Sequence, residues 1–230
     1  MKTLLISPHL DDAALSCATR LQGGEVTEVV TVFAGVPGSE EPLSEWDVLT
    51  KAPNARQRAI ERLAEDASAW ASIAQSFRHW NYVEAHTTGI DKAAMSREIG
   101  DLAGLFQCVL VPAGIGRHPH HVMVRDAALA ALPRNLRIIL YGELPYAGFF
   151  GWPTFDAHLD VEAQWRSDLA GVAPSRLSPP RLNALGAKQL AWKKELLAHY
   201  PSQMAAVSGG SLALFTTTNL LNYEVEFDLD

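Results

Sequence analysis

Short runs of consecutive apolar residues, separated by segments with helical spacing, constrain this chain more than any other feature. The runs lie at residues 3–7, 107–112 and 136–141, and a run rich in Val and Thr lies at residues 25–34. Strands that are apolar on both faces are typical of a parallel sheet covered by helices on both sides. Their alternation with helices predicts an α/β, Rossmann-like fold with a mostly parallel sheet and an active site at the carboxyl ends of the strands.

The helices between these strands are predicted from apolar spacing and from stop signals such as Gly23-Gly24. We expect them at residues 12–21, 55–76, 92–106, 121–131 and 186–198. In the second helix, the spacing of Ile60, Leu63 and Trp70 with several alanines predicts one apolar face.

Four other segments complete the pattern. Residues 77–83 and 221–227 are predicted to be further strands. Residues 35–54 and 145–183 have little periodicity, so we expect loops that shape a pocket.

Composition bounds the class of protein. The 230 residues are enough for a single domain spanning residues 1–230. A formal net charge of −7 disfavours nucleic acid and anionic lipid as partners, and no apolar run is long enough to span a bilayer. Cys17 and Cys108 lie in apolar surroundings, which favours two buried thiols and a cytoplasmic protein. The oligomeric state stays open, with a homo-oligomer as one alternative.

Three ionisable residues follow the first strand directly: His9, Asp11 and Asp12. Imidazole and carboxylate are common zinc ligands, and a catalytic zinc needs about three of them. A second, free carboxylate could then act as a base toward water. The alternative is structural, because Asp12 is a good N-cap for the following helix and Asp11 could be solvated.

A second polar cluster, Gly116 to His121, follows the buried strand at residues 107–112 and holds His118, His120 and His121. A solvated loop would explain this cluster alone. Two His/Asp clusters after two buried strands are stronger evidence, since the carboxyl ends of parallel strands meet at one edge of the sheet.

These residues resemble a known family. The stretch PHLDDAALSC, residues 8–17, is similar to the His-Pro-Asp-Asp motif of the LmbE-like (PIG-L) zinc-dependent N-deacetylases. GRHPHHVMVRDAAL, residues 116–129, resembles their second motif, His-x-Asp-His followed by a helix. Arg62 and Glu65 fit the family's Arg-x-x-Glu helix, and KKELLAHYPSQ, residues 193–203, resembles a Lys-rich helix ending in Ser-Gln.

The resemblance implies a function and roles for particular residues. It implies a hydrolase that removes an N-acyl group, most often acetyl, from an amino sugar such as N-acetylglucosamine or from a glycosylated metabolite, by attack of a metal-bound water. By position, Zn²⁺ or another divalent metal is held by His9, Asp12 and His121. Asp11 matches the general base, and a cationic His118 matches the oxyanion donor.

The chain departs from the family's pattern at three positions. Leu10 replaces a proline, and Gly116 stands where the glucosaminyl members often carry a tyrosine. His120 replaces an aspartate that would keep the neighbouring histidine charged. His120 is therefore expected to be a spare ligand or a substrate contact.

Five further residues each have two open interpretations. Arg62 and Glu143 are candidate substrate contacts, but a surface ion pair for Arg62 and a structural role for Glu143 are open alternatives. Trp46, Trp152 and Trp165 could stack on a sugar ring or pack in the core.

Two other functional classes compete with the hydrolase. A degenerate module that binds metal or sugar without turnover is the alternative, supported by His120. A nucleotide-binding Rossmann protein is disfavoured, because residues 8–13 read Pro-His-Leu-Asp-Asp-Ala instead of a glycine-rich loop.

Overall fold

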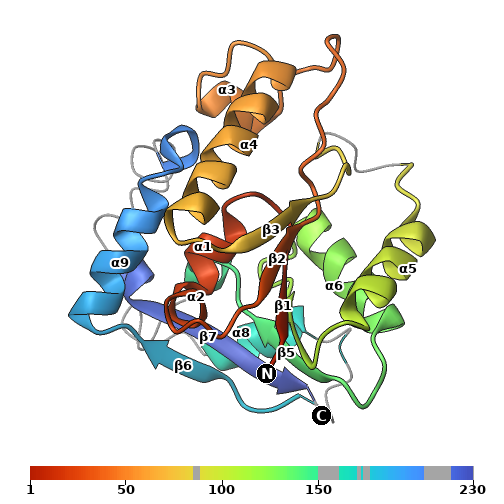
Figure 1. Ribbon diagram of the computed structural model, residues 1–230, viewed down its shortest axis with the longest axis vertical. Coiled ribbons are helices and arrows are strands. Elements are labelled where there is room, and N and C mark those ends of the chain that lie inside the picture. The colour runs from red at the N-terminus through yellow and green to blue at the C-terminus, as the bar shows by residue number, and fades with distance from the viewer. Residues whose placement is uncertain (85–88, 150–160, 170–171, 173–176, 205–218, 230) are drawn as a thin grey trace.

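The computed structural model describes residues 1–84, 89–149, 161–169, 172, 177–204 and 219–229. Its central feature is a seven-stranded sheet in the order β3-β2-β1-β4-β5-β7-β6 (Figure 1). The strands are β1 (Thr3–Ser7), β2 (Glu28–Thr31), β3 (Ser76–His79), β4 (Cys108–Pro112), β5 (Arg137–Tyr141), β6 (Arg181–Ala184) and β7 (Tyr223–Leu229).

Five neighbouring strands, in the order β3-β2-β1-β4-β5, pair in parallel. β1 pairs with β2 and β4 in parallel, with Leu5 opposite Val29 on one side and Leu110 on the other. β7 runs antiparallel to both β5 and β6. The three residues of this register are wholly buried, which confirms the predicted mostly parallel sheet with two covered faces.

Helices cover both faces of the sheet. Figure 1 shows α5 and α6 on one side and α1, α2, α4 and α9 on the other. The helices are α1 (Asp12–Ser16), α2 (Ala18–Gln22), α3 (Glu45–Leu49), α4 (Ala55–Ser72), α5 (Lys92–Ala103), α6 (Pro119–Ala131), α7 (Tyr146–Phe149), α8 (Val161–Asp168), α9 (Ala187–Leu197) and the short 3₁₀ helix η2 (Asn219–Asn222).

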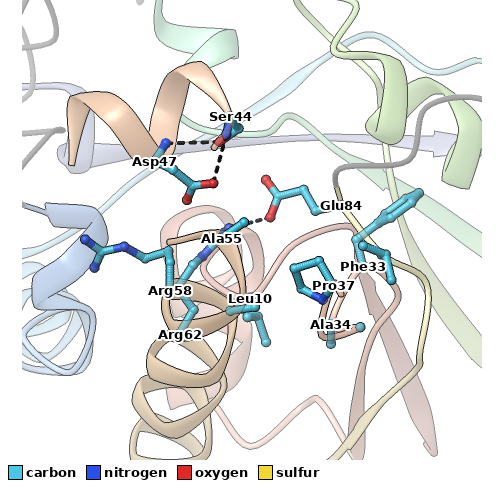
Figure 2. Close-up of a pocket in the computed structure, with 13 residues that line it drawn as sticks. Leu10, Phe33, Ala34, Pro37, Ser44, Asp47, Ala55, Arg58, Arg62 and Glu84 are labelled. Atoms are coloured by element: carbon cyan, nitrogen blue, oxygen red, sulfur yellow. Dashed lines mark hydrogen bonds and ion pairs between the residues drawn. The ribbon is translucent and has the colours of Figure 1, made fainter. Parts of the chain in front are cut away.

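Both segments predicted to be loops contain helices. α3 interrupts residues 35–54, because Ser44 and Asp47 form a capping box with reciprocal hydrogen bonds of 3.0 and 3.1 Å (dashed lines at the top of Figure 2). α7 and α8 lie in the described parts of residues 145–183. Trp165 belongs to α8 and packs in the core, whereas Trp152 lies outside the described residues.

The buried face of α4 differs from the predicted one. Ile60 is 50% exposed, and the inward face instead carries a set of mostly charged side chains together with Trp70. These buried residues are Ala55, Arg58, Arg62, Glu65, Asp66, Ala69 and Trp70. The apolar spacing failed because these charges have partners on distant segments, such as Tyr200 Oη, which donates to Asp66 at 2.7 Å.

Strand order sets the position of the functional edge. The chain leaves β1 toward β2 on one side, while β4 lies on the other side of β1. Such a switch in direction opens a crevice at the carboxyl ends of the two strands. Residues 8–12 follow β1 and residues 113–121 follow β4, so both polar clusters reach this crevice.

The cysteines and the lengths of the helices bear on two further predictions. Cys17 and Cys108 are free and buried, as predicted. Among the described residues, the helices are all too short or too polar to cross a membrane.

Candidate active site

The two polar clusters meet at the crevice between β1 and β4. His9 precedes α1, Asp12 is its first residue, and His121 lies in the first turn of α6. The backbone N–H of His9 donates to Asp12 Oδ2 at 2.9 Å, so this carboxylate folds back over the turn. Asp11, the N-cap residue, makes no side-chain capping bond. Asp12 is therefore not the N-cap of the following helix, and Asp11, with a side chain 13% exposed, is not fully solvated.

Three donor atoms form a nearly equilateral triangle. His9 Nδ1 lies 3.2 Å from Asp12 Oδ2 and 3.1 Å from His121 Nε2, and the last two atoms are 3.1 Å apart. Zinc ligands at ~2.0–2.1 Å in a tetrahedron lie ~3.3–3.4 Å from one another. The three side chains are buried, and their donor types are those of a divalent metal site. The residues therefore fit a metal ion.

Without a metal, the triangle is an ion pair. Burial raises the pKa of Asp12, but the charges and hydrogen bonds of His121 and His9 outweigh it and hold that pKa well below its usual value. Burial lowers the pKa of His121, but Asp12 and Glu143 outweigh it and raise that pKa to about 10. A metal ion would take the place of this proton, so its binding is coupled to proton release.

Glu143 supports the triangle from behind. Its side chain is 0% exposed, and Oε1 lies 3.2 Å from His121 Nδ1. It also accepts the backbone N–H groups of Gly114 at 2.7 Å and Ile115 at 3.4 Å. This corrects the expected substrate contact, because the carboxylate has no surface to offer and instead orients His121 and its loop.

Asp11 has a different environment from Asp12. Its Oδ1 lies 3.8 Å from Arg62 Nη2, and it lines the same cavity as His9. Burial raises the pKa of Asp11 to about 6, because the opposing charge of Arg62 offsets only part of the desolvation. The result is a carboxylate beside the donor triangle that is not one of its members.

Arg62 is held by Glu84, a residue that no sequence motif had singled out. The two side chains form an ion pair, and Glu84 is 38% exposed. Burial raises the pKa of Glu84, but Arg62 outweighs it and lowers that pKa to about 2. The only sequence signal for Glu84 is its place after a strand, five residues beyond the end of β3.

His118 also lines the cavity, as the N-cap residue of α6. Its ring centroid lies 4.9 Å from that of His9 and 4.7 Å from that of His121. Burial and the neighbouring histidines lower its pKa to about 3. These surroundings favour a neutral His118 over the cationic ring expected from the sequence, and a neutral ring has one N–H to donate.

His120 points into the protein instead of toward the cavity. It is 4% exposed and stacks on Phe33, with ring centroids 4.0 Å apart and an angle of 22° between the planes. Its Nδ1 lies 3.0 Å from His9 Nε2. It is therefore not placed to contact a substrate, although His9, His118 and His120 form a second group able to hold a metal.

The cavity has a volume of about 230 Å³. Its lining comprises His9, Asp11, Asp12, Leu15, Trp46, Arg62, Glu84, His118, Leu144, Pro145, Tyr146 and Gln203. Trp46 on α3 donates from Nε1 to Gln203 Oε1 at 2.6 Å. Glu65 accepts from Ser202 N at 2.9 Å and from Ser202 Oγ at 2.7 Å. The Arg62-x-x-Glu65 motif therefore contacts the motif at residues 193–203. Each motif also contributes one residue, Arg62 and Gln203, to the lining of the cavity.

A second, mainly apolar cavity of about 60 Å³ adjoins the first and shares Arg62 and Glu84 with it. Figure 2 shows Leu10, Phe33 and Pro37 around it, with the Arg62–Glu84 ion pair at its boundary. Leu10 therefore lines this neighbouring space and not the cavity of the donor triangle.

Comparison with known proteins adds independent evidence. Residues 4–132, more than half of the chain, match the family described as PIG-L: GlcNAc-PI de-N-acetylase. The chain is 27% identical over 172 residues to 2'-N-acetylparomamine deacetylase of Streptomyces fradiae, covering 64% of this chain and 58% of that protein. It thus spans less than two thirds of the length of this relative.

Solved structures share the fold. A deacetylase triple mutant from the teicoplanin biosynthetic pathway has a TM-score of 0.76 at 24% identity, covering 100% of this chain and 98% of the other. N,N'-diacetylchitobiose deacetylase from Pyrococcus horikoshii has a TM-score of 0.57 at 14% identity, covering 98% and 82%. The profile match spans both polar clusters, and the fold extends across the whole chain. This protein therefore belongs to the PIG-L (LmbE-like) family.

Proposed function

We propose that this protein is a metal-dependent hydrolase that removes an N-acyl group, acetyl in the first instance, from a small amino sugar or a glycosylated metabolite. The observation that carries the proposal is the 3.1–3.2 Å triangle of His9, Asp12 and His121 beside the separate carboxylate of Asp11. Family membership supports the reaction class. The relative named for deacetylating 2'-N-acetylparomamine supports an amino sugar as substrate.

Zinc is the metal that we propose. Two imidazoles and one carboxylate are a common ligand set for catalytic zinc, with a further position left for water or substrate. A solved structure with a TM-score of 0.72 and 23% identity is of the zinc-inhibited form of teicoplanin deacetylase, which supports a divalent metal in this fold but not zinc in particular. When bound, such an ion supplies a Lewis acid that lowers the pKa of water and polarises an acyl carbonyl.

Asp11 is the proposed general base. It lies in the cavity next to the donor triangle, and its pKa of about 6 leaves it ionised at neutral pH yet more basic than an ordinary aspartate. It would accept a proton from the attacking water and return it to the departing amine nitrogen. Arg62 limits the rise of this pKa and holds the carboxylate in place.

His118 is the proposed donor to the tetrahedral intermediate. As a neutral ring at the cavity wall, it offers one N–H to the developing oxyanion. Arg62 lines the cavity as well and remains a proposed contact for a substrate hydroxyl. Trp46, Pro145 and Tyr146 supply apolar surface that a sugar ring can pack against.

The test begins with metal content per chain, by elemental analysis, for the wild type, His121→Ala and the control His199→Ala. We expect about one zinc in the wild type and control and almost none in His121→Ala, because each zinc needs about three protein ligands. His199 contacts Ser68 at 3.0 Å and is absent from the site, so its loss should change nothing.

Acetate release from a panel of N-acetylated amino sugars then tests the reaction. We expect release by the wild type and His199→Ala but not by His121→Ala. A wild type that holds no metal after incubation with zinc would contradict the proposal. Zinc binding with no release from any substrate would favour the degenerate binding module.

A further inference from the structure

His9 uses its two ring nitrogens in opposite directions. Its Nδ1 faces Asp12 Oδ2 and His121 Nε2 at 3.2 and 3.1 Å, whereas its Nε2 faces His120 Nδ1 at 3.0 Å. A ring nitrogen that binds a metal carries no proton, so neutral His9 must carry its proton on Nε2 when Nδ1 is a ligand. That N–H needs an acceptor, because metal-binding histidines almost always donate their second N–H to a fixed partner.

His120 and Glu84 each place an acceptor atom near His9 Nε2. His120 Nδ1 is 3.0 Å away, within hydrogen-bond distance, whereas Glu84 Oε1 is 3.9 Å away and too distant for a direct bond. If His120 accepts at Nδ1, its own proton is on Nε2. That atom is buried and has no hydrogen-bond partner among the described residues, so the preference for this tautomer comes from the proton on His9 Nε2 and not from a partner of His120 Nε2.

Contacts with Phe33 fix the position of His120 relative to His9. His120 lies in the first turn of α6 and stacks on Phe33, with 4.0 Å between ring centroids. The backbone N–H of Phe33 donates to Pro8 O at 2.9 Å, next to His9 in the chain. The stacking ring, the acceptor and the ligand thus form one connected unit at the ends of β1 and β2.

We infer that His120 is a positioning residue of the metal site, whose Nδ1 accepts the Nε2–H of His9 and fixes the ring orientation and tautomer in which His9 Nδ1 meets the metal. The usual partner of such a ligand is a carboxylate, a carbonyl or water. Here a second imidazole takes that place. The inference rests on the proposed metal site, but not on any particular substrate.

Two substitutions separate the hydrogen bond from packing. His120→Phe keeps a ring to stack on Phe33 but removes the acceptor, whereas His120→Asn places an amide oxygen near the position of Nδ1. Zinc affinity is measured by competition with a chromophoric chelator. We expect zinc binding to be ~10–100-fold weaker in His120→Phe, because loss of the hydrogen-bond partner of a metal-binding histidine typically weakens metal binding by this factor. For His120→Asn, which keeps an acceptor, we expect a change below ~5-fold.

A spectroscopic measurement on the unmodified sequence tests the same bond directly. In ¹⁵N-labelled, zinc-loaded wild type, long-range proton–nitrogen spectra should show His120 with its proton on Nε2 and a hydrogen-bonded, unprotonated Nδ1. His9 should show a proton on Nε2. This readout decides the matter even if a substitution prevents folding, which circular dichroism of each variant would reveal.

The outcomes separate this inference from the proposed function. A wild type that binds no zinc overturns both. Tight wild-type binding with unchanged affinity in His120→Phe, or with the His120 proton on Nδ1, overturns only the role of His120. Equal weakening in His120→Phe and His120→Asn also overturns it, because the acceptor would then not be the cause. Weakening in Glu84→Gln alone would assign the bond to Glu84.

Discussion

Asp11 and Asp12 are neighbours of the same residue type, yet the structure gives them opposite properties. Burial raises the pKa of both, but His121 and His9 outweigh this effect at Asp12, whereas Arg62 only partly offsets it at Asp11. One carboxylate is therefore suited to bind a cation and the other to carry a proton. Two carboxylates whose environments separate their pKa values are a common basis for distinct catalytic roles.

Asp11→Asn should separate these roles. We expect acetate release to fall by ~10²–10⁴-fold, the usual contribution of a general base, with zinc content unchanged. Single-turnover kinetics and elemental analysis measure the two quantities, with Asp101→Asn on the exposed side of α5 as the control. Full activity would exclude Asp11 as the base, and loss of zinc would make it a ligand.

At the scale of elements, two glutamates on β7 bind α2, α9 and the neighbouring strand β6 through hydrogen bonds and ion pairs. Glu224 accepts from the backbone of Ala18 at 2.8 Å, at the start of α2, and from Lys193 Nζ on α9 at 3.0 Å. Lys193 is 0% exposed, so this is a buried ion pair that also caps a helix. Two residues further along β7, Glu226 accepts from Arg20 Nε at 2.5 Å and from Arg181 Nη2 at 2.8 Å.

Glu226 should make stability depend on pH. Burial raises its pKa, but the hydrogen bonds and charges of Arg20 and Arg181 outweigh it and lower the pKa below 4.5. A lowered pKa stabilises the folded state above the unfolded value of 4.5, and this stability is lost as pH falls through the folded value. Glu226→Gln should therefore lower the free energy of unfolding by ~1–3 kcal/mol at pH 7.

The measurement is urea unfolding of both proteins from pH 7 to pH 3. The difference between them should shrink as the pH falls below 4.5. Glu25→Gln is a suitable control, because that carboxylate contacts the same Arg20 at 2.6 Å but is 55% exposed. A difference that stays constant with pH would mean that packing and not charge is the cause.

At the scale of the whole molecule, the candidate metal site exists only in the folded chain. His9 and His121 are 112 positions apart in sequence, and the sheet alone brings them together. A ligand that binds only the native state stabilises it by mass action. Metal binding should therefore be visible as thermal stability, independently of any substrate.

We expect zinc at about 100 times its dissociation constant to add ~2.7 kcal/mol, which corresponds to a rise in Tm of ~5–11 °C for a chain of this size. Differential scanning fluorimetry with zinc and with a chelator measures it. His121→Ala should show no rise. An equal Tm for the wild type under both conditions would argue against a native metal site.

The sequence by itself determined the class of sheet and the edge that carries the polar clusters. Continuous apolar runs can only be buried on both faces, and parallel strands bring their carboxyl ends to one edge, so residues 8–12 and 116–121 had to lie near each other. The resemblance to the family motifs also assigned a candidate role to particular residues of these two segments. Their catalytic and ligand roles, and a single domain spanning the chain, stay predictions.

Only the tertiary structure decided how charged residues are paired. Spacing could not predict the inward face of α4 or the ion pair of Arg62 with Glu84. It also could not predict the contacts of Glu143 with His121 and of His120 with His9. The physical reason is that periodicity detects apolar burial, whereas a charged side chain is buried when a partner satisfies it. Those partners lie on other elements, and the fold alone brings them within reach.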